Sequence, residues 1–265
     1  MRGSIRAEIF LLGGDMVQKS AKHLIIGGGI IGCSIAYHLS RMGEKDVCLL
    51  ERANLTEGAT WHAAGLVGQL RSSRNTTRML KKSVEMYDRL QLQEGLQFDW
   101  KKTGSLRLAA TKERMLEARR LATMARSFDL EMHIISPSEA KQLFPLIEQN
   151  GLEGAAFIPS DGYVDPASLC QAIAGAARKQ GVDIRQRVEA LDFNVANGRI
   201  TSVETNEGRW DAENVIFATG MWSREIVAKL GIQVPACAVE HQYIVTESTG
   251  ADIGHYPTLR DPERL

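Results

Sequence analysis

The alternation of apolar and polar positions predicts a βαβ unit near the start of the chain. A short apolar run from His23 to Ile26 is typical of a buried strand, and helical spacing follows in CSIAYHLSRMG, which closes at Gly43. The segment DVCLLE, Asp46 to Glu51, predicts a second buried strand. Strand, glycine-rich turn, helix and strand in this order form a parallel, right-handed unit.

Helical periodicity dominates the middle of the chain. Helices are expected over residues 74–95, 112–128 and 169–180, and a strand is expected over 104–111. Another helix is predicted to begin at SPSEA, where Ser136 caps, Pro137 occupies the first position and Glu139 completes a capping box.

The period then changes from helical to alternating. Three strand-like segments follow one another, over residues 182–195, 198–206 and 208–220. ANG and NEG join them as hairpin turns, so we expect an antiparallel meander that ends in a buried strand, Val215 to Ala218. A helix over 223–230 and a long strand over 238–247 are the last elements expected in the sequence. The segment YPTLRDPERL that follows is interpreted as a polar loop.

Composition excludes several classes of protein. Apolar residues make up 44% of the 265 residues and charged residues 24%, as in an ordinary globular protein. Lysine plus arginine equals aspartate plus glutamate at 32 each, so no nucleic-acid partner is expected, and no apolar run is long enough to predict membrane insertion. The four cysteines lack zinc-ligand spacing, so no metal is expected, and a reducing compartment is favoured.

A glycine pattern in the first unit points to a dinucleotide. Gly27, Gly29 and Gly32 fit G-x-G-x-x-G between a strand and a helix, and Glu51 ends the next strand. The glycines allow the backbone to approach a pyrophosphate, the helix start offers N–H groups, and Glu51 can accept hydrogen bonds from ribose hydroxyls. The alternative is a purely structural glycine turn.

The rest of the chain favours FAD over NAD. No simple second βαβ repeat of the NAD type follows Glu51, and the chain continues instead into RANLTEGATWHAAGL. The later meander and VIFATGMWS match a flavoprotein in which an ATG turn after a buried strand returns to the cofactor.

Five segments together resemble one group of flavoenzymes. They are IIGGGIIGCSIAYHLSRMG, LLERANLTEGATWHAAGL, PSDGYVDPASLCQAIAGAA, VIFATGMWS and EHQYIVTE. The chain over about residues 20–265 is similar to the dimethylglycine and sarcosine dehydrogenase group of the D-amino-acid-oxidase-like (DAO) FAD oxidoreductases. The glycine fingerprint is shared by many families, whereas TWHAAGL and HQYIVTE are more specific to this group.

The resemblance implies that His62 is bonded covalently to the 8α-methyl group of FAD. The small neighbours Ala59, Ala63 and Gly65 would let the backbone lie close to the flavin, and a neutral imidazole is a nucleophile. The alternative is a histidine packed beside a non-covalent flavin. The other residues expected to contact the cofactor are Ile30, Ile31, Arg52, Gly58, Thr60, Trp61, Leu66, Val188, Thr219, Gly220 and Trp222.

Two further groups of residues are candidates for the substrate. His241 and Tyr243 lie two apart in the strand expected over EHQYIVTE, so they would face the same side and are the candidate catalytic residues. A basic stripe at helical spacing is interpreted as a solvated helix face, with attraction of a carboxylate substrate as the alternative. Its members are Arg71, Arg74, Arg78, Lys81 and Lys82.

The resemblance predicts an FAD-dependent amine dehydrogenase or oxidase that removes a methyl group from dimethylglycine or sarcosine. Its partners would be the N-methyl amine and an electron acceptor, either an electron-transfer flavoprotein or oxygen. Tetrahydrofolate would be used only through a region beyond residue 265. The alternatives are an FAD oxidoreductase for another amino acid and a non-catalytic regulatory paralogue, as in a subunit of a phosphatase that acts on pyruvate dehydrogenase. The expected location is the cytoplasm of a bacterium or the mitochondrial matrix of a eukaryote.

The expected fold is α/β, a Rossmann-like FAD-binding domain of the DAO type interleaved with an antiparallel-sheet substrate domain. FAD-binding segments are expected at 20–95 and 150–235, and substrate-domain segments at 96–149 and 236–265. Residues 1–15 are interpreted as a disordered appendage. The elements that would complete the sheet are missing, which predicts the amino-terminal part of a longer protein.

Overall fold

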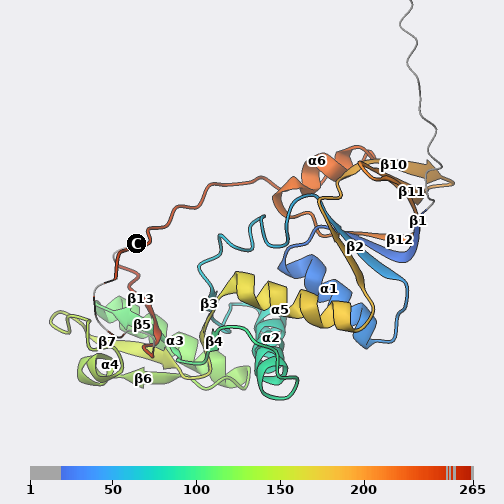
Figure 1. Ribbon diagram of the computed structural model, residues 1–265. Coiled ribbons are helices and arrows are strands. Elements are labelled where there is room, and N and C mark those ends of the chain that lie inside the picture. The colour runs from blue at the N-terminus through green and yellow to red at the C-terminus, as the bar shows by residue number, and fades with distance from the viewer. Residues whose placement is uncertain (1–18, 249, 251, 253–254, 264–265) are drawn as a thin grey trace, which may run out of the picture. The chain divides into compact units, whose positions relative to one another are not determined.

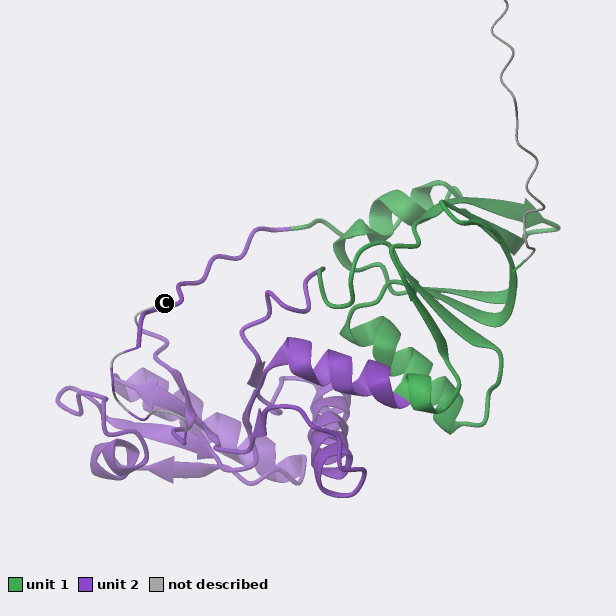
Figure 2. Cartoon of the chain, viewed as in Figure 1, with its two compact units in different colours: residues 1–57, 177–238 green, residues 58–176, 239–265 purple. Residues whose placement is uncertain are grey.

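The computed structural model describes residues 19–248, 250, 252 and 255–263, and these form two compact units. Unit 1 holds the described residues up to Glu57 together with 177–238, and unit 2 holds 58–176 with the described residues from 239 onward (Figure 2). The chain therefore enters each unit twice.

Unit 1 is built on a mixed six-stranded sheet. α1 (Ile30–Arg41) packs against the two strands that flank it in the chain, β1 (Lys19–Ile26) and β2 (Val47–Glu51). In spatial order the strands are β10 (Ala190–Ala196), β11 (Arg199–Thr205), β12 (Gly208–Phe217), β1 (Lys19–Ile26), β2 (Val47–Glu51) and β9 (Asp183–Gln186) (Figure 1). β12, β1, β2 and β9 are parallel, whereas β10, β11 and β12 form an antiparallel meander. The carboxyl ends of the four parallel strands thus share one edge.

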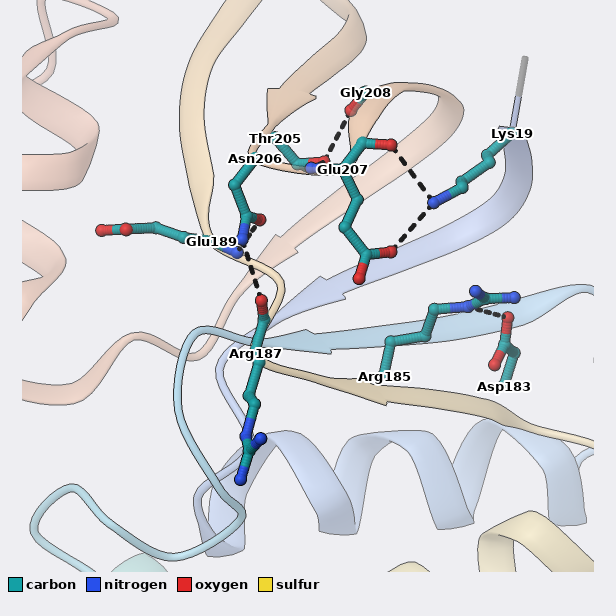
Figure 3. Close-up of polar contacts among 9 residues, drawn as sticks. All are labelled: Lys19, Asp183, Arg185, Arg187, Glu189, Thr205, Asn206, Glu207 and Gly208. Carbon is teal, nitrogen blue, oxygen red and sulfur yellow. Dashed lines mark hydrogen bonds and ion pairs between the residues drawn. The ribbon is translucent and has the colours of Figure 1, made fainter. Parts of the chain in front are cut away.

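The sheet of unit 1 is curled. β9 and β10 occupy its opposite edges, yet only residues 187–189 connect them. That link can span roughly 14 Å, whereas the outer strands of a flat six-stranded sheet would lie about 24 Å apart. The Asn206 side chain secures the link, because its Nδ2 donates to the Arg187 carbonyl at 2.9 Å and its Oδ1 accepts from the Glu189 N–H at 2.8 Å (Figure 3).

The core of unit 1 lies within this curl. Leu24, Leu50, Val188 and Val203 are almost completely buried there, and Trp210 packs with them. The cations of Lys19 and Arg185 lie over the Trp210 ring, 5.4 and 5.5 Å from its centroid. Aliphatic burial therefore holds the meander against the parallel strands.

Unit 2 contains two smaller sheets and most of the helices. Its four-stranded sheet has the order β13 (Thr258–Arg260), β5 (Ser105–Ala109), β7 (Gly154–Ile158) and β6 (His133–Ile135). Its three-stranded sheet has the order β3 (Leu66–Val67), β8 (Gly162–Val164) and β4 (Trp100–Lys101). The helices are α2 (Arg74–Leu92), α3 (Lys112–Ser127), α4 (Pro137–Leu143) and α5 (Pro166–Lys179), whose last residues belong to unit 1. In unit 1, η1 (Gly220–Trp222) and α6 (Ser223–Ala228) follow the meander.

Most of the predicted local structure is confirmed. The βαβ unit, the helices and both hairpins form, and Ser136 and Glu139 make the expected capping box at the start of α4. The predicted single strand over 182–195 is wrong, because it divides into β9 and β10 at the positive φ of Arg187. Residues Val215 to Ala218, at the end of the meander, were predicted to be buried but are only half-buried.

Two predictions near the end of the chain are also wrong. Residues 238–248 do not form a strand, because a strand needs a hydrogen-bonded neighbour and no described strand pairs with this exposed segment. Residues 258–260, interpreted as loop, form β13, because they find a parallel partner in β5. The short strands β3, β4, β6, β7 and β8 were not predicted.

The predicted α/β fold class is confirmed, with a Rossmann-like unit 1 and a predominantly antiparallel unit 2. Residues 58–95, predicted as an FAD-binding segment, pack within unit 2. Packing boundaries differ from cofactor contacts, so the predicted assignment of segments to the cofactor stays a prediction. The appendage expected at 1–15 lies outside the described residues.

Candidate cofactor-binding site

The glycine turn of unit 1 is packed too closely for side chains. Gly27 has a φ of +113°, and a Cβ there would lie 2.4 Å from the Ala218 carbonyl oxygen. A Cβ on Gly32 would lie only 1.9 Å from the Gly27 carbonyl oxygen. The turn therefore needs glycine both for its own geometry and to leave bare backbone at the carboxyl edge of the sheet.

The carboxylate of Glu51 holds this turn in place. Its Oε2 accepts from the Gly28 N–H at 2.6 Å, and its Oε1 accepts from the Ala53 N–H at 2.9 Å. Each carboxylate oxygen can accept a second hydrogen bond, so Glu51 can still receive a pair of vicinal hydroxyls. This is the position predicted for a ribose-binding acid.

The start of α1 offers positive polarity. Gly29 is its N-cap residue, with no side-chain hydrogen bond to the cap and no acidic residue in the first turn. Ile30 and Ile31 open the helix, and the Ile31 side chain is 62% exposed. Backbone N–H groups and the helix dipole at such a terminus favour a pyrophosphate.

The other predicted cofactor residues of unit 1 gather around the same edge. Ala218 donates its N–H to Ile26 O at 2.8 Å, which brings the ATG turn beside the glycine turn. Thr219 is buried there, and its hydroxyl lies 2.9 Å from that of Ser223. A 3-10 helix, Gly220 to Trp222, begins at the last residue of the ATG sequence.

Arg52 and Val188 extend this edge on the side of β2. The Arg52 guanidinium stacks over the Trp222 ring, 4.0 Å from its centroid. Val188 donates its N–H to Glu51 O at 2.9 Å, and its side chain is buried in the core. The edge thus presents bare backbone, helix N–H groups, a diol acceptor and a cation, which fit the pyrophosphate and ribose of FAD.

The Trp61–His62 pair lies in a turn of unit 2. Both side chains are exposed, and their rings stack at a tilt with centroids 4.2 Å apart. His62 Nδ1 lies 3.1 Å from Gly58 O, which suits an Nδ1–H donor and leaves the lone pair on Nε2. Thr60 is buried and its carbonyl accepts from the Ala63 N–H, so the turn is fixed on its inner side.

The turn continues into a strand through a required glycine. Gly65 has a φ of +73°, and a Cβ there would lie 2.1 Å from the Val164 carbonyl oxygen. Val164 donates its N–H back to Gly65 O at 2.9 Å, and Leu66 then pairs with Tyr163 in β8. Ala59 is exposed, so the surface around His62 consists of small side chains together with the Trp61 ring.

The candidate catalytic pair is not placed at a site. His241 and Tyr243 lie in the exposed segment without regular structure, so the shared strand face assumed for them is not formed.

The predicted basic stripe does not form one solvated helix face. Lys81 Nζ donates to the carbonyls of Phe128 and Asp129, whereas Arg71 lies before the start of α2.

A buried carboxyl group in unit 2 was missed by the sequence analysis. Asp161 is 2% exposed, and its Oδ1 accepts from the Gln69 N–H at 3.0 Å and from Gln69 Nε2 at 2.9 Å. Its Oδ2 accepts from Ser105 Oγ at 2.6 Å. Asp161 thus joins the loop after β3 to the first residue of β5. In the sequence, Asp161 stood out only as part of the segment PSDGYVDPASLCQAIAGAA, which carries the family resemblance.

We expect Asp161 to make the stability of the fold depend on pH. Burial raises the pKa of its carboxyl group, so above about pH 4 the folded protein loses stability as the buried group ionises. In Asp161→Asn the amide keeps both Gln69 bonds and can donate to Ser105. Urea unfolding at several pH values should show the variant gaining stability relative to the wild type as the pH rises.

Glu139 supplies the opposite control for this measurement. Hydrogen bonds from the Ser136 backbone and hydroxyl lower its pKa, so Glu139→Gln should lose stability relative to the wild type as the pH rises. If the free energy of unfolding changed with pH equally in Asp161→Asn and in the wild type, the result would contradict a buried Asp161 that ionises.

Membrane-spanning helices and metal-ligand clusters are absent from the part of the chain that the structure describes. Within it, no helix combines the length and apolarity needed to cross a membrane. Nor do any three histidine, cysteine or acidic side chains in the described ranges gather as a metal site.

Comparison with known proteins agrees with a dinucleotide-binding flavoprotein fold. The family model described as FAD dependent oxidoreductase (DAO) matches residues 22–265. Mitochondrial sarcosine dehydrogenase of Mus musculus is 35% identical over 253 residues, covering 92% of this chain and 27% of the relative. Mitochondrial dimethylglycine dehydrogenase of Rattus norvegicus is 37% identical over 250 residues, covering 93% and 29%. The chain spans less than a third of these two relatives.

A solved structure has the same fold. The crystal structure of L-proline dehydrogenase from P. horikoshii matches with a TM-score of 0.83 at 27% identity, covering 93% of this chain and 66% of that one. The chain therefore belongs to the FAD-dependent oxidoreductase (DAO) family. Its predicted resemblance to the dimethylglycine and sarcosine dehydrogenases is confirmed.

Proposed function

We propose that this protein is an FAD-dependent dehydrogenase or oxidase that acts on the CH–NH bond of an N-methylated glycine-type amine. Similarity to both sarcosine and dimethylglycine dehydrogenase over more than nine-tenths of the chain carries this proposal. The glycine turn and Glu51 supply the groups that would hold the cofactor. FAD, when bound, supplies the acceptor for a hydride equivalent from the N-methyl carbon.

The chain itself would bind and orient the reactants. A neutral amine is already electron-rich, so positioning contributes more than a strong base. Gly27 and Gly32 would keep the backbone close to the pyrophosphate, and Glu51 would accept the ribose hydroxyls. Hydrolysis of the oxidised amine would release formaldehyde.

We further propose that His62 is the covalent attachment site of the flavin. The Gly58 carbonyl would hold Nδ1–H, so that Nε2 carries the lone pair for a bond to the 8α-methyl carbon. That carbon would lose a proton, and the electron pair of the broken C–H bond would pass through the flavin to the electron acceptor. Because the neighbours of His62 other than Trp61 are small, the turn would allow close approach of a large planar ring. The resemblance in TWHAAGL supports this role.

The activity is tested with the purified holoprotein and a set of four amines: dimethylglycine, sarcosine, glycine and L-proline. We expect the two N-methylated substrates to reduce the flavin anaerobically and to yield one formaldehyde per turnover. Repeating the assay with oxygen and with an electron-transfer flavoprotein identifies the acceptor.

The same assay separates the alternatives. Reduction by glycine or proline without formaldehyde would replace the proposal with an oxidoreductase for another amino acid. A fully flavin-loaded protein that no amine in the set reduces would contradict the proposal and favour a regulatory paralogue.

A further inference from the structure

A glutamine lies beside Glu51 at the cofactor edge of unit 1. Gln186 is the last residue of β9, and it is the partner of Glu51 in the parallel register of β9 and β2. Residues paired in neighbouring strands point to the same face of a sheet, and such strands lie about 4.8 Å apart. The Gln186 side chain therefore begins next to the side chain that is expected to accept the ribose hydroxyls.

The amide of Gln186 is oriented by a backbone N–H group. Its Oε1 accepts from the Leu55 N–H at 2.8 Å. Only the oxygen of a carboxamide can accept this hydrogen bond, so the amide cannot be turned around. Gln186 is exposed, and within the described ranges its Nε2 has no hydrogen-bond partner. The two N–H groups of Nε2 are thus available to a ligand.

The loop after β2 joins Gln186 to the glycine turn. The Thr56 N–H donates to Gly28 O at 3.2 Å. Leu55 is 2% exposed, and a Cβ on Gly28 would lie only 2.6 Å from Leu55 Cδ2. Because Leu55 also donates its N–H to Gln186, the loop, the glycine turn and β9 form one hydrogen-bonded corner.

The backbone that follows Gln186 is held on two sides. The Arg187 N–H donates to Ala53 O at 3.0 Å, which ties the end of β9 to the loop after β2. On the other side, Asn206 Nδ2 donates to the Arg187 carbonyl at 2.9 Å (Figure 3). A side chain on a backbone held in this way loses little conformational freedom when it binds a ligand.

Glu51 and Gln186 offer complementary groups at this corner. A carboxylate accepts hydrogen bonds, the Nε2 of a glutamine donates them, and a hydroxyl group does both. A vicinal diol can therefore donate to Glu51 and accept from Gln186 at the same time.

We propose that Gln186 is a second ribose-recognition residue, which donates from Nε2 to a hydroxyl oxygen of the adenosine ribose of FAD while Glu51 accepts from the same diol. The inference rests on the proposed function, in which Glu51 accepts the ribose hydroxyls, and it adds a residue that the glycine fingerprint does not contain. Gln186 thereby becomes a determinant of the preference for a ribose that carries both hydroxyl groups.

The test compares the affinity of FAD with the affinities of two analogues whose adenosine ribose lacks either the 2′- or the 3′-hydroxyl. All proteins carry His62→Ala, so that no covalent bond prevents equilibrium, and flavin fluorescence reports binding to the apoprotein. With Gln186 in place, the protein should prefer FAD to at least one analogue by about tenfold or more. Gln186→Met should reduce that preference about fivefold.

A second variant and a matched control accompany this comparison. Gln186→Glu keeps an acceptor for the Leu55 N–H but has no N–H to offer, so it should also lose the preference. Gln180→Met is the control, because Gln180 Oε1 likewise accepts a hydrogen bond, from Ser40 Oγ at 2.9 Å, but Gln180 precedes the amino end of β9. It should keep the preference, and thermal melts should show that all variants fold.

A purely structural effect of Gln186 would weaken the binding of FAD and of both analogues by the same factor. An unchanged preference in Gln186→Met would therefore overturn the proposal. Loss of the preference in Gln186→Met with full retention in Gln186→Glu would overturn it as well, because Gln186 would then act only by anchoring Leu55.

The titrations and the amine assay can fail separately. A preference that depends on Gln186 in a protein that oxidises no amine would contradict only the proposed amine oxidation. Amine oxidation with an unchanged preference would contradict only the role of Gln186. A folded apoprotein that binds no FAD would overturn both.

Discussion

Flavin fluorescence should remain in the polypeptide band after the holoprotein is denatured in acid and run on a gel, and His62→Ala should abolish it. A covalent bond survives loss of the fold, whereas contacts to the glycine turn and Glu51 do not. His62→Ala should still bind FAD non-covalently, because those contacts belong to other residues.

A second readout distinguishes attachment from simple proximity. The bond should make the flavin a stronger oxidant, so amine turnover in His62→Ala should fall more than FAD affinity does. His133→Ala is the control, because His133 is an exposed histidine of unit 2 that pairs with Glu131 at 2.9 Å. A dark wild-type band from a yellow, active protein would reject covalent attachment and leave the oxidoreductase proposal standing.

Gly32→Ala should reduce the flavin content by roughly a hundredfold or more. The added methyl group would lie 1.9 Å from the Gly27 carbonyl oxygen, so the β1–α1 turn must open. That movement would displace the N–H groups expected to contact the pyrophosphate. Flavin absorbance relative to protein absorbance measures the loss, and circular dichroism reports whether the fold persists.

Gly175→Ala supplies the matched control for this substitution. Gly175 lies in α5, and a Cβ there would meet nothing within 4 Å. Alanine should stabilise this helix by roughly 0.5–1 kcal/mol and leave the flavin content unchanged. Normal flavin content in Gly32→Ala would show that the glycine turn does not hold the cofactor.

Short-range patterns were enough to predict the glycine turn of unit 1 and the strand that ends at Glu51. Gly27 directly follows β1, Gly32 lies in the first turn of α1 and Glu51 ends β2, and each of these elements has its own periodicity or turn signal. The capping box at Ser136 was predictable for the same reason, since all of its hydrogen bonds are local.

The sequence by itself therefore determined the βαβ unit, the glycine turn and the family resemblance of this protein. Only the tertiary structure decided that β9 joins β2, that residues 238–248 remain unpaired among the described strands, and that Asp161 bonds to Gln69 and Ser105. Likewise, Gln186 lies beside Glu51 because β9 pairs with β2 in this register. Such contacts join segments far apart in the chain, and their formation depends on which surfaces the folded core brings together.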